Sequence, residues 1–225
     1  MKMKLDMPNL PKNFQVCDTS LVCHNISVLR DKNTDSELFR AAVRRICMIL
    51  INKAFENIPL MTKNVETPLV ATDAKVIDDK SEFIIAPILR AGLVFSDVAS
   101  DILPKAKVHH IGLYRDEETL RPVAYYNNLP KSFSDPAKTY IYVFDPMLAT
   151  GGSAIEAVKL FTDLNIPQEN ITFVSLIAAP EGVLKLSSTF SRIKMITGTL
   201  DSHLNEHGYI LPGLGDAGDR SFNTL

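Results

Sequence analysis

The sequence predicts an α/β protein with a mostly parallel sheet flanked by helices, and three observations lead to this class. Apolar segments rich in β-branched and aromatic residues alternate with helical segments, as in parallel sheets with right-handed crossovers. The strand candidates are continuous apolar runs, which is typical of strands covered on both faces. A Gly-rich turn joins one such run to an apolar helix. Because no shift in composition divides the 225 residues, we expect a single domain over residues 1–225.

Composition and charge exclude several classes of protein. The 24 Lys and Arg residues against 26 Asp and Glu give a formal charge of −2, which argues against binding nucleic acid through a basic surface. No apolar run reaches the roughly 18–20 residues of a membrane span, and residues 1–12 lack the apolar core of a secretory signal. Three cysteines without a C-x-x-C pair are typical of a reducing compartment. We therefore expect a cytoplasmic protein without nucleic-acid or membrane partners.

The N-terminal part of the chain contains an irregular segment and a long helix. Residues 1–25 are either an arm that lies over the body or a neighbouring subunit, or a partly disordered tail. The pattern Thr34-x-x-Glu37 fits a capping box and predicts a helix over residues 37–58, ended by Pro59. This helix either covers one face of the sheet or contributes to a dimer contact.

The rest of the chain follows the expected alternation of strands and helices. The expected elements are strands at 67–70 and 83–88, a helix at 93–103, a strand at 108–114, a β-arm at 114–128, a strand at 140–144, a helix at 154–161, a strand at 171–177, a helix at 180–189 and a strand at 193–197.

Residues 139–157, TYIYVFDPMLATGGSAIEA, contain the strand, turn and helix that organise the chain. The strand ends at Asp145, where open α/β sheets bind ligands. Unpaired backbone N–H groups at the start of the following helix suit a phosphate, and Thr150 and Ser153 add hydroxyl donors. An ordinary helix start with Thr150 or Ser153 as its cap explains the same residues equally well.

The segment FDPMLATGGSA resembles the motif with which type I phosphoribosyltransferases bind 5-phosphoribosyl 1-diphosphate (PRPP). Its sequence is most similar to that of the uracil phosphoribosyltransferases. In the wider superfamily a second acidic residue usually stands at the position of Pro146, and the uracil branch shares this departure. The resemblance implies that Asp145 alone holds the ribose diol. The implied PRPP-binding residues of this segment are Asp145, Pro146, Met147, Leu148, Ala149, Thr150, Gly151, Gly152 and Ser153.

Two further segments resemble loops of the same family. Residues 87–92, PILRAG, resemble its pyrophosphate loop, which implies that Arg90 binds PRPP, although by position alone it is an ordinary surface residue. Type I relatives often carry a non-proline cis peptide in this loop. Residues 114–120 resemble the mobile arm of the uracil enzymes, in which Arg115 would reach the diphosphate with its fork of donors. Without the resemblance, this segment is a charged hairpin turn.

Residues 205–220, NEHGYILPGLGDAGDR, resemble the signature of the uracil phosphoribosyltransferases. The resemblance implies a uracil pocket formed by Ile210, Gly215, Asp216 and Ala217. It also implies that Asp216 faces PRPP, where it either stabilises a positively charged ribose or orients water on a metal ion. Main-chain N–H and C=O groups can match the acceptor, donor and acceptor edge of uracil, whereas cytosine would leave a buried group unpaired.

The implied fold is a parallel core sheet with a small hood, here formed in part by residues 200–225. The implied reaction joins uracil to PRPP, giving UMP and diphosphate, a step of pyrimidine salvage. Arg115, Asp145 and Asp216 would be catalytic, and Mg²⁺ would arrive bound to the diphosphate of PRPP. Some relatives are activated by GTP through their oligomer, so GTP is a candidate effector, and a homodimer or homotetramer is expected.

Two other functions are open to a chain of this kind. One is a non-catalytic regulator of the same fold that binds nucleotides or RNA, against which the acidic balance and the intact PRPP motif argue. The other is the same transfer to a different base, and the Gly215-Asp216-Ala217 sequence disfavours purines. The spacing of His203 and His207 would suit two metal ligands on a helix, but no third ligand is evident, so no protein-held metal is expected.

Overall fold

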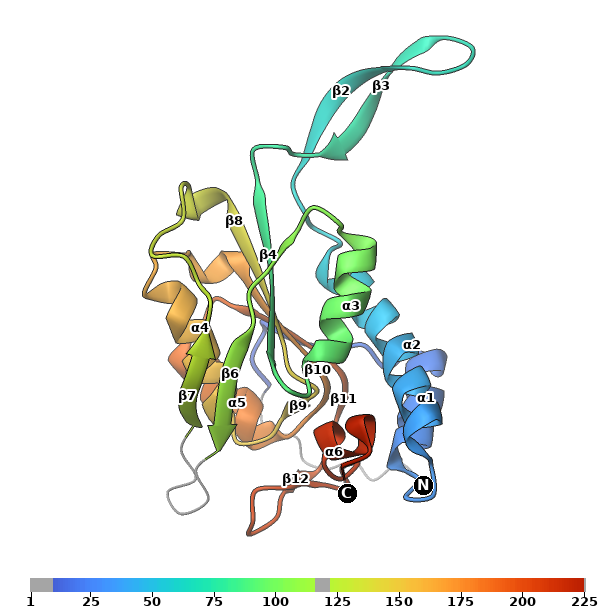
Figure 1. The fold of residues 1–225 in the computed structure, drawn as a ribbon, viewed down its shortest axis with the longest axis vertical. Helices are drawn as coiled ribbons and strands as arrows, with labels where there is room; N and C mark the ends of the chain where they lie inside the picture. The colour runs from blue at the N-terminus through green and yellow to red at the C-terminus, as the bar shows by residue number, and fades with distance from the viewer. Residues whose placement is uncertain (1–9, 116–121, 225) are drawn as a thin grey trace.

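A computed structural model describes residues 10–115 and 122–224 and shows a central sheet with helices on both faces (Figure 1). The strands of this sheet are β1 (Phe14–Val16), β4 (Glu82–Leu89), β5 (Lys107–Val108), β6 (Ile111–Arg115), β7 (Pro122–Asn127), β8 (Thr139–Phe144), β9 (Met147–Leu148), β10 (Ile171–Ala178) and β11 (Lys194–Leu200). Their order is β1-β11-β10-β8-β4-β6-β7, with β5 beside β4 and β9 beside β10. The described strands pair in parallel from β1 to β6, which confirms the expected sheet, and β7 pairs antiparallel to β6.

The helices lie on two faces of this sheet. The helices are α1 (Ser20–Arg30), α2 (Ser36–Ala54), α3 (Leu93–Ile102), α4 (Gly152–Thr162), α5 (Pro180–Thr189) and α6 (Ala217–Phe222), with short 3₁₀ turns at Pro136–Lys138 and Gln168–Asn170. Helices α1, α2 and α3 cover one face, whereas α4 and α5 cover the other (Figure 1). No helix among the described residues is long and apolar enough to cross a membrane.

The central strands are apolar on both sides, as their continuous apolar runs predict. In β8, Ile141 and Val143 belong to the core under α4 and α5, and Tyr142 and Phe144 belong to the core under α1, α2 and α3. All four side chains are at most 4% exposed. Since successive residues of a strand point to opposite faces, both layers of helices are packed against the same strand.

The expected long helix is α2, but it ends at Ala54 rather than at residue 58, and its start also differs from the prediction. Asp35 is the N-cap, and its Oδ1 accepts a hydrogen bond of 2.8 Å from the Leu38 amide. The hydroxyl of Thr34 instead donates to the Val28 carbonyl at 2.7 Å. The capping-box prediction was therefore displaced by one residue, because Thr34 is used to close the α1–α2 turn.

The described part of the N-terminal segment, residues 10–25, is more ordered than the sequence predicted, and residues 1–9 lie outside the described residues. Of the expected arm at residues 1–25, Phe14–Val16 form β1 at the edge of the sheet, and α1 begins at Ser20. Val22, Ile26 and Leu29, at helical spacing, are at most 4% exposed. These apolar positions are separated by polar residues, and the segment is short, so its periodicity was weak.

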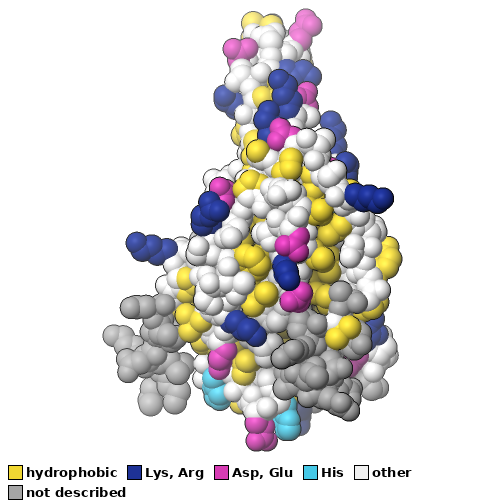
Figure 2. Space-filling view, turned by 90° about the vertical axis from the view of Figure 1, so that its left-hand side faces the viewer, with side chains coloured by type: hydrophobic (Ala, Val, Ile, Leu, Met, Phe, Trp, Pro, Cys, Tyr) yellow, Lys and Arg dark blue, Asp and Glu magenta, His cyan; other side chains and the backbone are white. Residues whose placement is uncertain are grey.

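A two-stranded hairpin projects from the body (Figures 1 and 2). It consists of β2 (Leu60–Glu66) and β3 (Ala71–Ile77), and Figure 2 shows charged side chains of both signs along it. The strand expected at residues 67–70 was wrong, because these residues form the turn of the hairpin. The hydroxyl of Thr67 donates to the Val70 carbonyl at 2.8 Å and closes this turn.

The arm and the C-terminal segment lie at the same end of the molecule (Figure 1). The expected β-arm at 114–128 corresponds to β6 and β7, and residues 116–121 lie outside the described residues. After β11 the chain forms a small antiparallel pair, β12 (His203–Leu204) with β13 (Ile210–Leu211), and then α6. Because His203 lies in a strand, the helical spacing considered for His203 and His207 does not occur.

Candidate functional site

The turn between β8 and α4 has an unusual helix start. Gly151 is the N-cap of α4, with a φ of 77°, and no side chain caps this end. The alternative in which Thr150 or Ser153 caps the helix is therefore wrong. Amide groups at the start of an uncapped helix, together with the positive end of its dipole, attract anions.

A cavity lies directly in front of this helix start. Its volume is about 120 Å³. It is lined by Asp145, Met147, Leu148, Ala149, Thr150, Gly151, Gly152, Ser153 and Ala154. The predicted PRPP segment thus surrounds one hollow, except for Pro146. A larger hollow of about 1120 Å³ between the base of the β2–β3 hairpin and the end of α3 contains none of the predicted site residues.

Gly182, in the first turn of α5, supports this turn from behind. A Cβ atom on Gly182 would lie 2.3 Å from the Ala149 carbonyl oxygen and 2.9 Å from that of Leu148. A Cβ atom on Gly151 would lie 3.1 Å from the Gly182 carbonyl oxygen. This role of Gly182 was not predicted from the sequence. A glycine just inside a helix, where its propensity is poor, was the available signal.

Asp145 follows β8 at the rim of the cavity. Its amide donates to the Val174 carbonyl at 3.2 Å, and its Oδ1 accepts from the Met147 amide at 3.4 Å. Burial of the carboxyl group raises the pKa of Asp145 to about 7. The Met147 amide lowers this pKa, and the charge of Asp216 raises it. Asp216 is therefore near enough for the two carboxylates to interact.

The loop after β4 lies beside this site. The Leu89–Arg90 peptide bond is cis. A Cβ atom on Gly92 would lie 2.6 Å from both the Ile88 and the Phe144 carbonyl oxygens, so this turn packs closely on the end of β8. Because β4 and β8 are neighbouring parallel strands, the loops after them meet at the same edge of the sheet.

The C-terminal segment approaches the same edge. The Leu211–Pro212 peptide bond is cis, and Gly215 has a φ of 79°. The carboxylate of Asp216 caps α6 by accepting from the Asp219 amide at 2.9 Å. Asp219 in turn contacts the guanidinium of Arg90 at 3.4 Å, and this side chain of Arg90 is 60% exposed. Arg90, Asp145 and Asp216 thus come together from three distant parts of the chain.

The pocket residues predicted for uracil flank a tight turn. Ile210 and Ala217 are buried, whereas Gly215 and Asp216 are exposed. Arg220 of α6 attaches the segment to α1, because its guanidinium donates to the carbonyl oxygens of Leu29, Asp31 and Leu214. The same guanidinium lies 4.4 Å from the centre of the Phe39 ring.

Arg115 is the last residue of β6, and the position of its side chain lies outside what the structure describes. Strand β6 pairs with β4, so the arm begins beside the Arg90 loop. The predicted contact of Arg115 with the diphosphate stays a prediction. Within residues 10–115 and 122–224, no group of three or more His, Cys, Asp or Glu side chains is arranged to hold a metal ion.

The chain is similar to known proteins over most of its length. A family model described as uracil phosphoribosyltransferase matches residues 16–224. A uracil phosphoribosyltransferase of Burkholderia ambifaria is 46% identical over 224 residues, covering 100% of this chain and 99% of the relative. One from Lactococcus lactis subsp. cremoris is 48% identical over 211 residues, covering 94% and 98%.

Solved structures share the fold. The AQ2163 protein from Aquifex aeolicus has a TM-score of 0.84 and 33% identity, covering 93% of this chain and 97% of that one. An adenine phosphoribosyl transferase from Trypanosoma brucei has a TM-score of 0.56 at 11% identity, covering 84% and 83%, and supports the type I fold alone. From the matched residues and the extent of these likenesses, we conclude that the chain belongs to the uracil phosphoribosyltransferase family.

Proposed function

We propose that this protein transfers the phosphoribosyl group of PRPP to uracil, giving UMP and diphosphate, as a step of pyrimidine salvage. The observation that carries the proposal is the uncapped start of α4 at Gly151, immediately after Asp145, in a chain of this family. We call the start of α4 and the cavity in front of it, lined by Asp145 and residues 147–154, the PRPP cradle. The Arg90 loop and the C-terminal segment lie next to this cradle, so one ligand can touch all three.

The 5′-phosphate of PRPP would occupy the cavity lined by residues 145–154. Backbone amides at the start of α4 would donate to the phosphate there, and the hydroxyls of Thr150 and Ser153, which also line this cavity, can donate further hydrogen bonds. Glycine at positions 151 and 152 lets the backbone approach the phosphate oxygens closely. The carboxylate of Asp145 would accept hydrogen bonds from the ribose hydroxyls.

The diphosphate would be bound by Arg90 and Arg115. The contact between Arg90 and Asp219 is exposed and 3.4 Å long, so it is weak and can be exchanged for diphosphate oxygens. Mg²⁺ would be held mainly through the diphosphate, since it prefers oxygen ligands and binds substrate phosphates readily. When bound, the ion neutralises charge on the leaving diphosphate.

Uracil would bind to the segment that contains Ile210, Gly215, Asp216 and Ala217. Backbone N–H and C=O groups of this segment can pair with the edge of uracil, and a base with the opposite pattern would leave one of them unpaired. The buried side chain of Ile210 offers an apolar contact for the ring. The tight positive-φ turn at Gly215 exposes the backbone in this segment.

The protein would promote this reaction mainly by stabilising charge, without forming a covalent bond to the substrate. The bond between C1′ and the diphosphate oxygen breaks, and its electron pair leaves with the diphosphate. The new bond forms between C1′ and N1 of uracil, which releases its proton. Asp145 and Asp216 place negative charge near the ribose as it becomes positive, while Arg90 and Arg115 neutralise the leaving group.

A spectrophotometric assay with uracil, PRPP and Mg²⁺ tests this function. We expect uracil to be consumed in step with the formation of UMP and diphosphate, and cytosine and hypoxanthine to remain unchanged. Turnover of another base in place of uracil would contradict the proposal, as would nucleotide binding without any turnover.

The projecting β2–β3 hairpin supports the proposal of a homodimer or homotetramer. An isolated two-stranded hairpin is only marginally stable in water, yet this one exposes large apolar side chains. They are Leu60, Leu69, Val70 and Ile77, which are 56%, 95%, 67% and 41% exposed. Light scattering of the purified protein measures the mass, and a monomer at micromolar concentration would contradict this assembly.

A further inference from the structure

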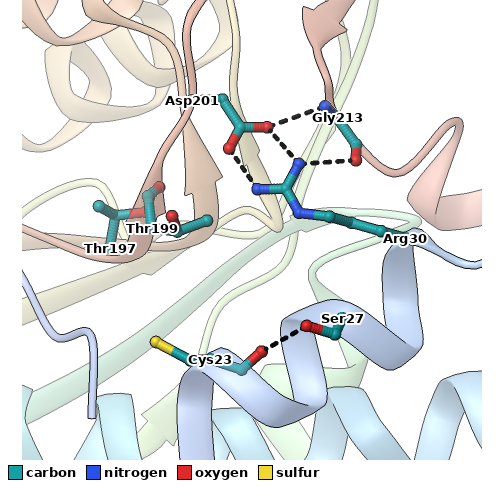
Figure 3. Close-up of polar contacts among 7 residues, drawn as sticks. All are labelled: Cys23, Ser27, Arg30, Thr197, Thr199, Asp201 and Gly213. Carbon is teal, nitrogen blue, oxygen red and sulfur yellow. Dashed lines mark hydrogen bonds and ion pairs between the residues drawn. The ribbon is translucent and has the colours of Figure 1, made fainter. Parts of the chain in front are cut away.

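An ion pair that shares no residue with the PRPP cradle binds both backbone polar groups of one residue of the C-terminal segment (Figure 3). The guanidinium of Arg30, at the end of α1, donates to both carboxylate oxygens of Asp201, at 2.5 and 3.0 Å. It also donates to the Gly213 carbonyl at 3.1 Å. Asp201 accepts from the Gly213 amide at 2.8 Å. These hydrogen bonds join the three residues in a closed ring, which we call the Arg30–Asp201–Gly213 ring.

The ring is mostly shielded from water. The side chain of Asp201 is 2% exposed, and that of Arg30 is 27% exposed. A shielded ion pair loses favourable hydration free energy. The attraction between its charges compensates for this loss only when further hydrogen bonds complete the geometry. The two bonds to Gly213 provide that completion. The N–H and the C=O of this one residue are therefore both used by the ion pair, which fixes the backbone there in position and orientation.

Both charged residues are attached to rigid elements. Asp201 follows β11 directly, and its amide donates to the Ala178 carbonyl of the neighbouring strand at 2.8 Å. Arg30 ends α1, whose apolar side is packed in the core. The ring therefore fixes the position of Gly213 relative to the sheet and to α1.

Gly213 lies in the tightest part of the segment that carries the proposed uracil pocket. It has a φ of 65°, and a Cβ atom there would lie 2.1 Å from the Ile210 carbonyl oxygen. It comes three residues after Ile210 and two before Gly215, so a shift of Gly213 displaces both sides of the pocket. The PRPP cradle after β8 contributes no atom to the ring.

We infer that Arg30 and Asp201 are positioning residues for the pyrimidine base, which set the affinity and selectivity for uracil through the backbone at Gly213 without touching the substrate. This inference rests on the proposed role of the C-terminal segment. Arginine suits the task because its rigid fork engages a carboxylate and a carbonyl at once, which an ammonium group cannot reproduce.

The test uses the double variant Arg30→Gln/Asp201→Asn in the full-length protein. Replacing both charges together avoids leaving one buried charge unpaired. Asn has nearly the same volume as Asp, and Gln keeps a polar end on a side chain two heavy atoms shorter than that of Arg. We expect the KM for uracil to rise by about tenfold or more, because small misplacements of binding groups weaken productive binding strongly. We expect the KM for PRPP to stay within about twofold of the original value. The preference for uracil over cytosine should fall.

Two further variants supply the conservative change and the matched control. Arg30→Lys keeps the charge but loses the fork, so its KM for uracil should lie between those of the original protein and the double variant. Arg44→Gln removes an arginine whose 2.9 Å ion pair with Asp101 is exposed on the same layer of helices. This control should leave both KM values unchanged.

The affinity for PRPP distinguishes a loss of positioning at Gly213 from a loss of the fold. Calorimetric titration with PRPP should give the original affinity for the double variant. An unchanged KM for uracil would overturn the inference, and so would a joint rise of both KM values in a protein that still melts cooperatively, because that result indicates a general structural role.

Gly215→Val distinguishes failure of this inference from failure of the proposed pocket. If Gly215→Val raises the KM for uracil and the ring variants do not, only the role of Arg30 and Asp201 is wrong. If Gly215→Val leaves this KM unchanged, the pocket assignment is wrong, and the inference is overturned with it.

Discussion

Asp145 has a pKa of about 7, well above its ordinary value of 3.8, chiefly because its carboxyl group is buried and secondarily because Asp216 carries a like charge. The folded protein therefore keeps this proton to a higher pH than the unfolded chain does. Between these two pKa values the folded state binds more protons, so the contribution of Asp145 favours folding at low pH and is lost as the pH rises through 7.

Asp145→Asn removes this dependence. We expect the ligand-free variant to gain thermal stability relative to the original protein, and the gain should be larger at about pH 8 than at about pH 5. Scanning calorimetry at both pH values measures the difference. A gain that does not change with pH would contradict the raised pKa. The same variant should lose transfer activity at about pH 8, where Asp145 is ionised, because an amide is a poorer acceptor than a carboxylate for the ribose hydroxyls.

Gly151→Val should abolish PRPP binding. Valine is strongly disfavoured at a φ of 77°, and its side chain would enter the space between the helix start and the Gly182 carbonyl. Calorimetric titration with PRPP measures the loss. Gly208→Val is a matched control, since Gly208 has a φ of 75° and lies outside the cradle. Normal affinity in Gly151→Val would refute the cradle.

Arg115→Ala should lower kcat/KM by about 10²-fold or more, since a group that neutralises the leaving diphosphate acts mainly in the transition state. The melting temperature should change little. Arg192→Ala, which removes an exposed ion pair with Glu169, is the control and should keep its activity. Kinetics of Arg115→Ala that match those of the control would remove Arg115 from the site.

At the scale of elements, the start of α5 determines the shape of the PRPP cradle. Alanine at position 182 is favoured over glycine in a helix by about 1 kcal/mol, but its Cβ would lie 2.3 Å from the Ala149 carbonyl. We expect the steric clash to outweigh the gain in helix propensity, so Gly182→Ala should raise the KM for PRPP. Steady-state kinetics against Ser188→Ala, at the exposed end of the same helix, measures this effect. Equal values in both variants would show that the cradle tolerates the added atom.

The elements differ in how well the sequence predicts them. Strand β8, expected at 140–144, and helix α4, expected at 154–161, were predicted because a doubly buried strand and an apolar helix leave strong patterns. The β2–β3 hairpin was missed, since strands exposed on both sides need no regular alternation. Helix α1 was also missed, because only its buried stripe is apolar.

The residues of the candidate site also differ in how well the sequence predicts them. The motif at residues 145–153 and Asp216 were predicted by resemblance, and the structure brings them together. Gly182 and the Arg30–Asp201–Gly213 ring were not predicted. Their roles depend on contacts between residues far apart in the chain, and such contacts leave no local pattern in a single sequence.

At the scale of the whole molecule, the proposed assembly offers a route to regulation. We expect GTP to raise kcat with uracil as substrate, accompanied by a change in oligomeric mass, because differential affinity for two assembly states shifts their populations. Initial rates across GTP concentrations, with ATP as the control nucleotide, measure this effect. Rates that are flat across the GTP series would rule it out.

The pairing of β1 with β11 has a consequence for the order in which the molecule is completed. Phe14 lies opposite Met195, so β1 cannot pair with its neighbour until β11, about 180 residues further along the chain, has been synthesised. Contacts between such remote segments form slowly. The amino-terminal edge should therefore be among the last parts to gain protection in pulsed hydrogen-exchange experiments during refolding.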